Sequence, residues 1–397
     1  EFLSKILAVR DGLTALRHVV GVGGAPGGVH DFDTLKAGAA DTRPEVTVDR
    51  QAVAFIQYTS GTTGKPKGAM VSHANVLAVI DATKDLPGAR QALEEDVILL
   101  VLPLFHAYAL NLAMNRAFLG VTPFVLVSRF DAARGLALME RHRVTIFYGA
   151  PPMYFAFVNT PGLEGYDLSS LRSAFSGAAP LPVVILERFK ARTGVQISEG
   201  YGLSETAPTL CSNAAGPVNK PGTVGPAIPG VEIRLVDAQG RDVRPGEVGE
   251  ILARGPNVFR GYWNREAESA EALANGWFHT GDLARVDADG YYTIVDRKKD
   301  MILVSGFNVF PNELENVLLR HPKILDAAVI GVPDEYQGES VKAVVVLREG
   351  QSVADREIIE YCREHLAACK APRHVEVRNA LPKSQTGKVL KRGMRTS

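Results

Sequence analysis

The chain has 397 residues, of which 46% are apolar, so it can bury a large core and is expected to fold as two or three domains. Lysine plus arginine and aspartate plus glutamate balance at 44 each, which excludes the basic field typical of proteins that bind nucleic acid or an anionic membrane. We therefore expect small-molecule partners. The composition leaves peripheral membrane contact and the oligomeric state open.

The three cysteines, Cys211, Cys362 and Cys369, have neither a C-x-x-C spacing nor an even count. This pattern suits a reducing, cytoplasmic location and argues against a structural zinc site. The most apolar region, residues 97–127, is interrupted by prolines and by polar side chains that include Arg116. It therefore lacks the run of about eighteen apolar residues that would predict a membrane span.

The N-terminal stretch predicts a helix over residues 3–16 and a buried strand over residues 16–22, which runs into a glycine-rich segment at 21–28. This segment imitates a dinucleotide-binding fingerprint, but Pro26 occupies the position of the third glycine and no helical pattern follows. We interpret it as a loop, followed by a polar linker to Arg50.

Residues 58–68, Tyr-Thr-Ser-Gly-Thr-Thr-Gly-Lys-Pro-Lys-Gly, have the composition of a phosphate-binding loop between the apolar run 52–56 and a helical stretch from Asn75. Hydroxyls, lysines and glycines that allow close backbone approach together form an anion receptor. The loop is not that of P-loop NTPases, because Pro66 stands where the second glycine is required. The candidate phosphate-binding residues are Thr59, Ser60, Gly61, Thr62, Thr63, Gly64 and Lys67.

Helical and short strand patterns then alternate through Val195, as in a doubly wound α/β sheet. One motif in this region, residues 102–108, places His106 in an otherwise apolar turn, where a histidine is more often a core residue than a site residue. A second, residues 199–206, offers Tyr201 as a flat face for a purine and Glu205 as a hard oxygen ligand suited to Mg²⁺.

From residue 220 to 297 the sequence pattern changes to short runs of alternating apolar and polar residues with frequent turns. This pattern predicts a small antiparallel β subdomain with strands near 231–236, 249–253 and 291–295. A charged run at 296–308 follows, and beyond it an α+β pattern: a helix from Pro311, strands over 327–332 and 342–347, and a helix over 355–368 that carries Cys362 and Cys369. Residues 381–388 form a Pro/Gly-punctuated loop that ends at Lys388.

These motifs resemble those of the adenylate-forming acyl-CoA synthetase superfamily, the AMP-binding enzymes, over nearly the whole chain. Residues 199–208 and 295–313 look most like those of bacterial long-chain fatty acid–CoA ligases. The resemblance implies an adenylation domain over 1–297, missing its N-terminal segment, with the β subdomain at about 220–297. It also implies a smaller, mobile C-terminal domain over 298–397 with a hinge at Lys299.

The resemblance also assigns roles, with ATP and coenzyme A as substrates and Mg²⁺ as the metal. Lys388, Glu205 and His106 are the implied catalytic residues; Lys388 bridges the substrate carboxylate and the α-phosphate, and Glu205 with Thr59 holds the metal. Asp282 and Arg297 hold the ribose. The remaining implied contacts are Gly177, Ala178, Ala179, Tyr201, Gly202 and Thr206 for the nucleotide, and Ser305 and Gly306 beside the coenzyme A channel.

The expected function is activation of a long-chain fatty acid as an acyl-adenylate and its transfer to coenzyme A. The predicted pocket walls, residues 102–110, 147–153 and the Ser176 loop, are apolar and contain no arginine or lysine, which favours acyl chains. Medium-chain or aryl acids remain open. So do an inactive nucleotide-binding remnant and an adenylate former that delivers its acyl group to a carrier-protein thiol or to oxygen.

Overall fold

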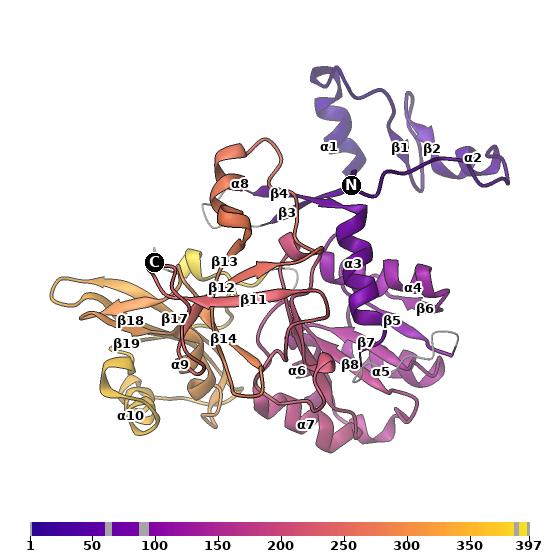
Figure 1. The fold of residues 1–397 in the computed structure, drawn as a ribbon. Coiled ribbons are helices and arrows are strands. Elements are labelled where there is room, and N and C mark those ends of the chain that lie inside the picture. The colour runs from indigo at the N-terminus through magenta and orange to yellow at the C-terminus, as the bar shows by residue number, and fades with distance from the viewer. Residues whose placement is uncertain (1, 60–65, 87–94, 385–388, 395–397) are drawn as a thin grey trace. The chain divides into compact units, whose positions relative to one another are not determined.

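The computed structural model describes residues 2–59, 66–86, 95–384 and 389–394 (Figure 1). Five of the predicted phosphate-loop residues and the predicted catalytic lysine lie outside these ranges: Ser60, Gly61, Thr62, Thr63, Gly64 and Lys388. The chain divides into two compact units, Glu1–Asp49 and Arg50–Ser397. The predicted boundary at 297/298 falls inside the second unit and stays a prediction.

The first unit is small and mostly exposed. Its elements are α1 (Phe2–Val9), a 3₁₀ turn η1 (Arg10–Gly12), the parallel strands β1 (Val20–Gly21) and β2 (His30–Asp31), and α2 (Phe32–Ala37). The predicted helix over 3–16 thus ends early, and the predicted buried strand over 16–22 shrinks to two residues. The reason is that α1 buries no residue within this unit, so its apolar pattern has no core to pack on.

The second unit opens with a β-hairpin that the sequence did not predict. Strand β3 (Val53–Thr59) pairs antiparallel with β4 (Lys67–Ser72), and Thr59 lies opposite Lys67. The predicted phosphate loop therefore connects two adjacent strands and not a strand to a helix. Helix α3 (His73–Lys84) follows directly, capped by the Ser72 side chain, which accepts the backbone N–H of Asn75 at 3.2 Å.

A six-stranded sheet with the order β10-β9-β8-β7-β5-β6 forms the centre of this unit. All neighbouring strands are parallel except β10, which pairs antiparallel with β9. The strands are β5 (Ile98–Leu100), β6 (Phe124–Leu126), β7 (Ile146–Gly149), β8 (Ser173–Ser176), β9 (Ile197–Tyr201) and β10 (Cys211–Ser212). The order, with crossovers between parallel neighbours, confirms the predicted α/β sheet.

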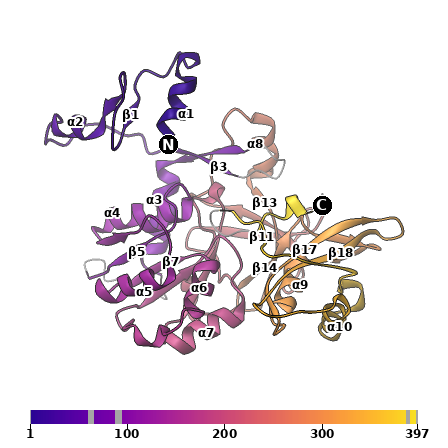
Figure 2. The ribbon, with the colours of Figure 1, turned by 180° about the vertical axis from the view of Figure 1, so that it is seen from behind.

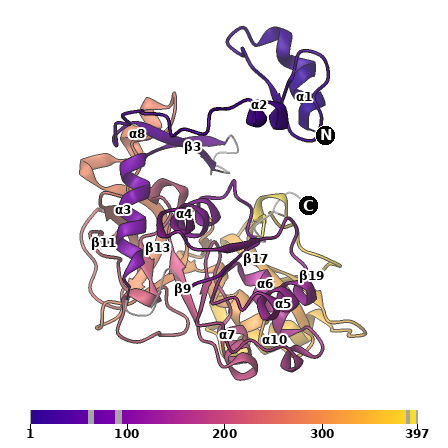
Figure 3. The ribbon, with the colours of Figure 1, turned by 90° about the vertical axis from the view of Figure 1, so that its right-hand side faces the viewer.

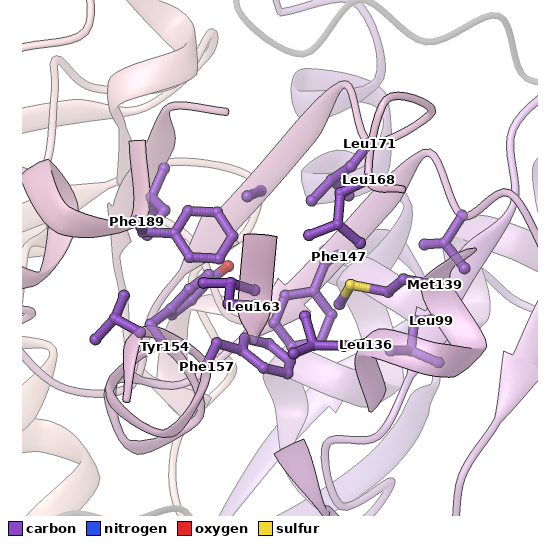
Figure 4. Close-up of a cluster of buried hydrophobic side chains, with 14 of the residues drawn as sticks. Leu99, Leu136, Met139, Phe147, Tyr154, Phe157, Leu163, Leu168, Leu171 and Phe189 are labelled. Atoms are coloured by element: carbon purple, nitrogen blue, oxygen red, sulfur yellow. The ribbon is translucent and has the colours of Figure 1, made fainter. Parts of the chain in front are cut away.

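Alternate residues of the central strands pack into two different layers, as strand geometry requires. Leu99 and Phe147 belong to a core shared with α5 (Ala132–Arg141), α6 (Pro151–Val158) and α7 (Val183–Thr193). Figure 4 shows this cluster, in which Tyr154 stands among aromatic rings and donates its hydroxyl to the carbonyl oxygen of Phe175 at 2.6 Å.

The opposite face of the sheet is covered by one continuous helical segment. It consists of a π-helix, η3 (Tyr108–Asn115), which passes directly into α4 (Arg116–Gly120). Residues of β5 and β7 on this face, including Tyr148, form a core with Tyr108 and Ala113. Parts of the predicted walls of the substrate pocket, including Tyr108 and Tyr148, therefore lie on this side of the sheet, whereas Phe147 packs on the other side.

The β subdomain is a four-stranded antiparallel sheet with the order β11-β12-β13-β14. Its strands are β11 (Glu232–Val236), β12 (Gly249–Arg254), β13 (Phe278–Val286) and β14 (Tyr292–Arg297), and α8 (Glu266–Ala272) with the 3₁₀ turn η7 (Ala274–Gly276) precedes β13. The sequence did not predict β13, because its glycine resembled a turn. Gly281 indeed has a positive φ of 71°, but it lies within the strand.

The C-terminal part forms a second α+β layer, visible around β17 and β18 in Figures 1 and 2. Its strands are β15 (Ile302–Val304), β16 (Phe307–Val309), β17 (Ile324–Asp334), β18 (Gly338–Leu347) and β19 (His374–Val377), in the order β16-β15-β18-β17 with β19 beside β18. Helices α9 (Pro311–Leu318) and α10 (Asp355–His365) pack on this sheet. Because α10 ends at His365, Cys369 does not lie on it, contrary to the sequence prediction.

Short helical turns complete the second unit: η4 (Leu163–Gly165), η5 (Ser204–Thr206), η6 (Asn213–Ala215), η8 (Ala368–Lys370) and η9 (Lys391–Met394). Figure 1 shows α3 and α5 in the α/β part, away from the strands of the C-terminal sheet, and Figure 3 shows α3 from the side, where it follows the β3–β4 hairpin. Among the helices that the structure describes, none has the length and apolar character needed to cross a membrane.

The predicted hinge is fastened by a buried carboxyl. Asp296, near the end of β14, accepts the backbone N–H groups of Arg297 at 2.8 Å and of Asn312 at 2.9 Å, the latter in the first turn of α9. Burial raises the pKa of Asp296 to about 6, and the nearby charge of Lys391 opposes this rise. The Asp296 side chain thus links the end of β14 to the start of α9, the two elements that flank the predicted hinge at Lys299.

We expect Asp296→Asn to change how the stability of the protein depends on pH. The pKa of Asp296 in the folded state is higher than its ordinary value of 3.8, so its contribution to stability is complete below about pH 4 and is lost as the pH rises through about 6. The melting temperature of the wild type should therefore fall across this window relative to that of the variant. Parallel melting curves from pH 4 to pH 7 would contradict this reading.

Candidate active site

A cavity of about 500 Å³ opens at the carboxyl ends of the parallel strands. Its walls come from the β3–β4 hairpin, from η3 and α4, from the ends of β7, β8 and β9, and from β13 and β14. Parallel sheets bind their ligands at this edge. The predicted site residues that line the cavity are Thr59, Lys67, His106, Gly177, Ala178, Tyr201, Gly202, Glu205 and Arg297.

Six predicted site residues within the described ranges do not line the cavity: Ala179, Thr206, Asp282, Lys299, Ser305 and Gly306. Thr206 is fully buried, and its hydroxyl accepts the N–H of Leu203 at 2.9 Å and donates to the carbonyl oxygen of Leu203 at 3.0 Å. Its side chain therefore stabilises the η5 turn that presents Glu205. Lys299 lies in an exposed turn after β14.

Asp282 acts on the cavity through two neighbours. It is 4% exposed; its Oδ2 accepts the Tyr201 hydroxyl at 2.7 Å, and its Oδ1 lies 3.2 Å from Arg297 Nε. The register of β13 and β14 places Asp282 directly opposite Arg297. Burial, with the Asp282 charge as the next cause, raises the pKa of Tyr201 and keeps its hydroxyl a donor. Three residues from three strands thus form one polar group.

Glu205 is a buried carboxylate in the cavity wall, with 7% of its surface exposed. Burial raises its pKa, whereas the hydroxyl of Tyr262, which donates to Oε1 at 2.9 Å, lowers it. Among the described residues no cluster of three or more His, Cys, Asp or Glu side chains can hold a metal. A metal ion here would therefore take its other ligands from phosphate oxygens and water, as Mg²⁺ does in nucleotide sites.

Tyr262 is a site residue that the sequence reasoning missed. Its ring lies 5.1 Å from Lys67 Nζ, which is itself 3.7 Å from Glu268 Oε2. The segment that carries Tyr262 runs beside β4, where Trp263 donates its N–H to the carbonyl oxygen of Gly68 at 2.8 Å. No motif in the sequence pointed to this long-range contact between the hairpin and the β subdomain.

Arg116 is the second missed residue. It begins α4 and lines the cavity, although it is 5% exposed and falls outside the three predicted wall stretches. Those stretches do contribute, through residues 105–108, Tyr148 and residues 176–178. The expectation of walls without a basic residue was therefore incomplete. The available signal was an arginine inside the most apolar region of the chain.

His106 lies just before η3 and faces the same cavity. Its Nδ1 accepts the backbone N–H of Tyr108 at 3.3 Å, which fixes the ring at the start of the helical wall. Gln57 of β3 donates to the carbonyl oxygen of Phe105 and so ties the hairpin to this turn. The histidine therefore stands between the predicted phosphate-binding hairpin and the wall formed by η3.

A parallel α/β sheet, a β subdomain and an α+β C-terminal part thus surround one cavity that is lined by both polar and apolar side chains. The profile of the AMP-binding enzyme family matches residues 6–263, and that of the AMP-binding enzyme C-terminal domain matches residues 313–388. The chain therefore belongs to the AMP-binding enzyme family.

Curated relatives carry two kinds of name. The chain is 40% identical over 342 residues to a long-chain-fatty-acid–CoA ligase of Bacillus subtilis (strain 168), covering 86% of this chain and 61% of that protein. It is 41% identical over 358 residues to a feruloyl-CoA synthase of Amycolatopsis sp, covering 89% and 71%. The chain thus spans about three fifths of the length of the fatty-acid ligases that it matches.

Solved structures agree on the fold. ATP-bound MatB from Rhodopseudomonas palustris matches with a TM-score of 0.88 and 34% identity, covering 94% of this chain and 73% of that one. The anthranilate CoA ligase AuaEII in complex with anthranoyl-AMP matches with a TM-score of 0.89 and 31% identity, covering 100% and 76%. These likenesses confirm the predicted fold class.

Proposed function

We propose that the protein is an AMP-forming acid–thiol ligase. In the first step a carboxylate attacks the α-phosphorus of ATP and pyrophosphate leaves; in the second the thiol of coenzyme A displaces AMP from the acyl-adenylate. The observation that carries the proposal is that Tyr201 and Arg297, joined by Asp282 behind them, line one cavity together with buried Glu205. Both steps depend on positioning and charge.

The nucleoside is held by the group of Tyr201, Asp282 and Arg297. Asp282 lies behind the cavity wall, where one oxygen accepts the Tyr201 hydroxyl and the other is ion-paired with Arg297. Each carboxylate oxygen has a further lone pair, so Asp282 can still accept the ribose hydroxyls. Gly177 and Ala178, at the end of β8, supply a wall without bulky side chains for the adenine. Glu205 with Thr59 would hold Mg²⁺, which neutralises phosphate charge when bound.

The C-terminal part is proposed to alternate between the two steps about Lys299. Ser305 and Gly306 are the two central residues of the β15–β16 hairpin, with φ values of 50° and 84°. Both positive φ values mark a type I′ turn, whose exposed backbone suits the edge of a pantetheine channel. Thioester formation would bring this turn to the cavity and withdraw the segment that carries Lys388.

The identity of the substrate acid is the more specific part of the proposal. The first candidate substrate is a long-chain fatty acid, which would imply a role in cytoplasmic fatty acid metabolism. This assignment is based on the sequence motifs and is supported by the names of relatives. An aryl or otherwise polar acid is the second candidate. It is supported by a relative named feruloyl-CoA synthase and by the buried arginine in the cavity wall.

We expect the complete protein to release pyrophosphate and AMP and to form a coenzyme A thioester. The measurement is ATP–pyrophosphate exchange followed by thioester detection, with medium- and long-chain fatty acids, a hydroxycinnamic acid, acetate and an amino acid. Exchange with no acid would favour the inactive remnant. Exchange without a thioester would favour a carrier-protein or oxygen acceptor, and acetate or an amino acid as the fastest substrate would contradict both candidate acids.

A further inference from the structure

We propose that Arg116 anchors an electronegative group, such as a carboxylate, at the end of the acid that is remote from the reacting carboxyl. The preferred substrate is then an acid of medium length that is polar at both ends. The inference rests on the proposed ligase function, which supplies the reaction. The polar group of the ligand is inferred from the geometry of the cavity wall.

Arg116 is a buried cation without a described anion. Its guanidinium donates to the carbonyl oxygens of Thr83 and Lys84, each at 3.1 Å, and more weakly to the Thr83 hydroxyl at 3.4 Å. Its Nε has no hydrogen-bond partner, and none of the ion pairs found among the described residues includes Arg116. Backbone carbonyl groups compensate a buried charge only in part, so a bound anion would stabilise Arg116 further.

A purely structural reading is that Arg116 caps the C-terminal end of α3. The carbonyl groups there carry a partial negative charge of about half an elementary unit, which favours a cation. This accounts for two of the guanidinium nitrogens and for the position of the side chain. It leaves Nε unsatisfied, and it does not explain why a charged cap lines the cavity together with Thr83 and Leu86.

Other buried polar atoms of the same cavity also lack partners. The Tyr148 hydroxyl and the Ser176 hydroxyl have no hydrogen bond, and both residues line the cavity at 3% exposure. Tyr148 is held in place by stacking on Phe175 at 5.1 Å. An alkyl chain would leave these buried donors unsatisfied, which is unfavourable. A ligand with acceptor atoms would satisfy them.

The helical wall sets the distance between the two ends of the acid. Tyr108, Leu112 and Arg116 recur at every fourth residue and all line the cavity, and His106 precedes them. Ten residues of helix span roughly 15 Å or less, and the arginine side chain reaches back over part of that length. Such a spacing fits an acid of medium length and does not fit acetate.

The test compares two acids of equal length, octanoate and octanedioate, on the complete protein. At saturating ATP and coenzyme A, the wild type is expected to show a kcat/KM for octanedioate at least about tenfold higher than for octanoate, since a site built for a polar group rejects the analogue that lacks it. Arg116→Met is expected to lower kcat/KM for octanedioate by about 10² and to leave that for octanoate unchanged or improved. The ratio of the two values does not depend on the fraction of folded protein.

Arg116→Lys serves as the conservative variant. It keeps the charge and the contact with the end of α3 but loses the forked geometry, so it should retain part of the preference. Equilibrium binding of both acids to the three proteins, measured by calorimetry, separates this inference from the ligase function. A binding preference without any thioester would remove the ligase function and leave the anchor standing. Equal binding and equal turnover of the two acids by the wild type would overturn the anchor.

Discussion

Replacing Lys388 with alanine is expected to lower acyl-adenylate formation by about 10²–10³, the usual loss when one preorganised charge donor is removed. Thioester formation from supplied acyl-adenylate should be spared. Lys388 lies outside the described residues, but Ser384 and Leu390 on either side of it line the cavity. Lys383 and Val389, which flank this segment, pair with each other.

The same segment provides matched controls. Lys383 Nζ lies 2.5 Å from Asp326 Oδ2, and Lys391 Nζ lies 2.7 Å from Glu315 Oε1. Alanine at either position also removes one positive charge, but from a pair that is internal to the C-terminal part. We expect a smaller effect on adenylation from these variants than from Lys388→Ala. A loss as large in Lys383→Ala would indicate that the charge of the segment, and not one lysine, matters.

The hinge variant Lys299→Pro is expected to have the opposite effect: acyl-adenylate formation should be spared and thioester formation should fall. Proline fixes φ, so the turn after β14 can no longer rotate once the first step is complete. Single-turnover assays on acid plus ATP, and separately on acyl-adenylate plus coenzyme A, measure the two half-reactions. Equal losses in both half-reactions for both Lys388→Ala and Lys299→Pro would contradict domain alternation.

The second large effect is expected for Glu205→Gln. The change keeps the size of the side chain and its contact with Tyr262, but it removes the negative charge proposed to hold Mg²⁺ on the phosphates. Adenylation at limiting Mg²⁺ should fall by about 10². The fold should persist, because the Thr206 hydroxyl and not the Glu205 carboxylate closes the η5 turn. An unchanged rate at limiting Mg²⁺ would rule out Glu205 as the ligand.

Glu199→Gln is the matched control for this variant. Glu199 lies on β9, is as buried as Glu205 at 7% exposure, and does not line the cavity. Burial raises its pKa to about 7, so half of the population is already neutral near that pH and glutamine is a close substitute. The dependence of adenylation on Mg²⁺ should therefore be the same in Glu199→Gln as in the wild type.

The sequence predicted the parts of the site that lie within one motif. Tyr201 and Glu205 were found together because they are only four positions apart, Tyr201 at the end of β9 and Glu205 in the η5 turn that follows, and the alternating apolar runs predicted the parallel sheet. The strand β13 was missed because Gly281, with its positive φ, resembles a turn in any local pattern. Only the pairing of β13 with β12 and β14 makes the segment a strand.

The residues that could not be predicted depend on contacts between distant segments. Tyr262 reaches Glu205 across 57 positions of sequence, and Arg116 reaches Thr83 across 33. A local pattern contains no information about such pairs, since tertiary packing alone brings them together. For Thr206 the motif suggested a nucleotide contact, which stays a prediction; the structure adds that its hydroxyl makes two bonds to Leu203.

The π-helix η3 makes the direction of Arg116 depend on how this segment winds. A π-helix bonds residue i to i+5 and thus holds about one residue more than an α-helix would over the same turn. If the same residues between Tyr108 and Asn115 formed an ordinary α-helix, the residues that follow would be turned by about 100° about the axis, whereas removal of one residue together with that change would largely restore their direction. Relatives in which this segment has the same length but winds as an α-helix are therefore expected to lack an arginine in the cavity wall at this position and to select a different acid.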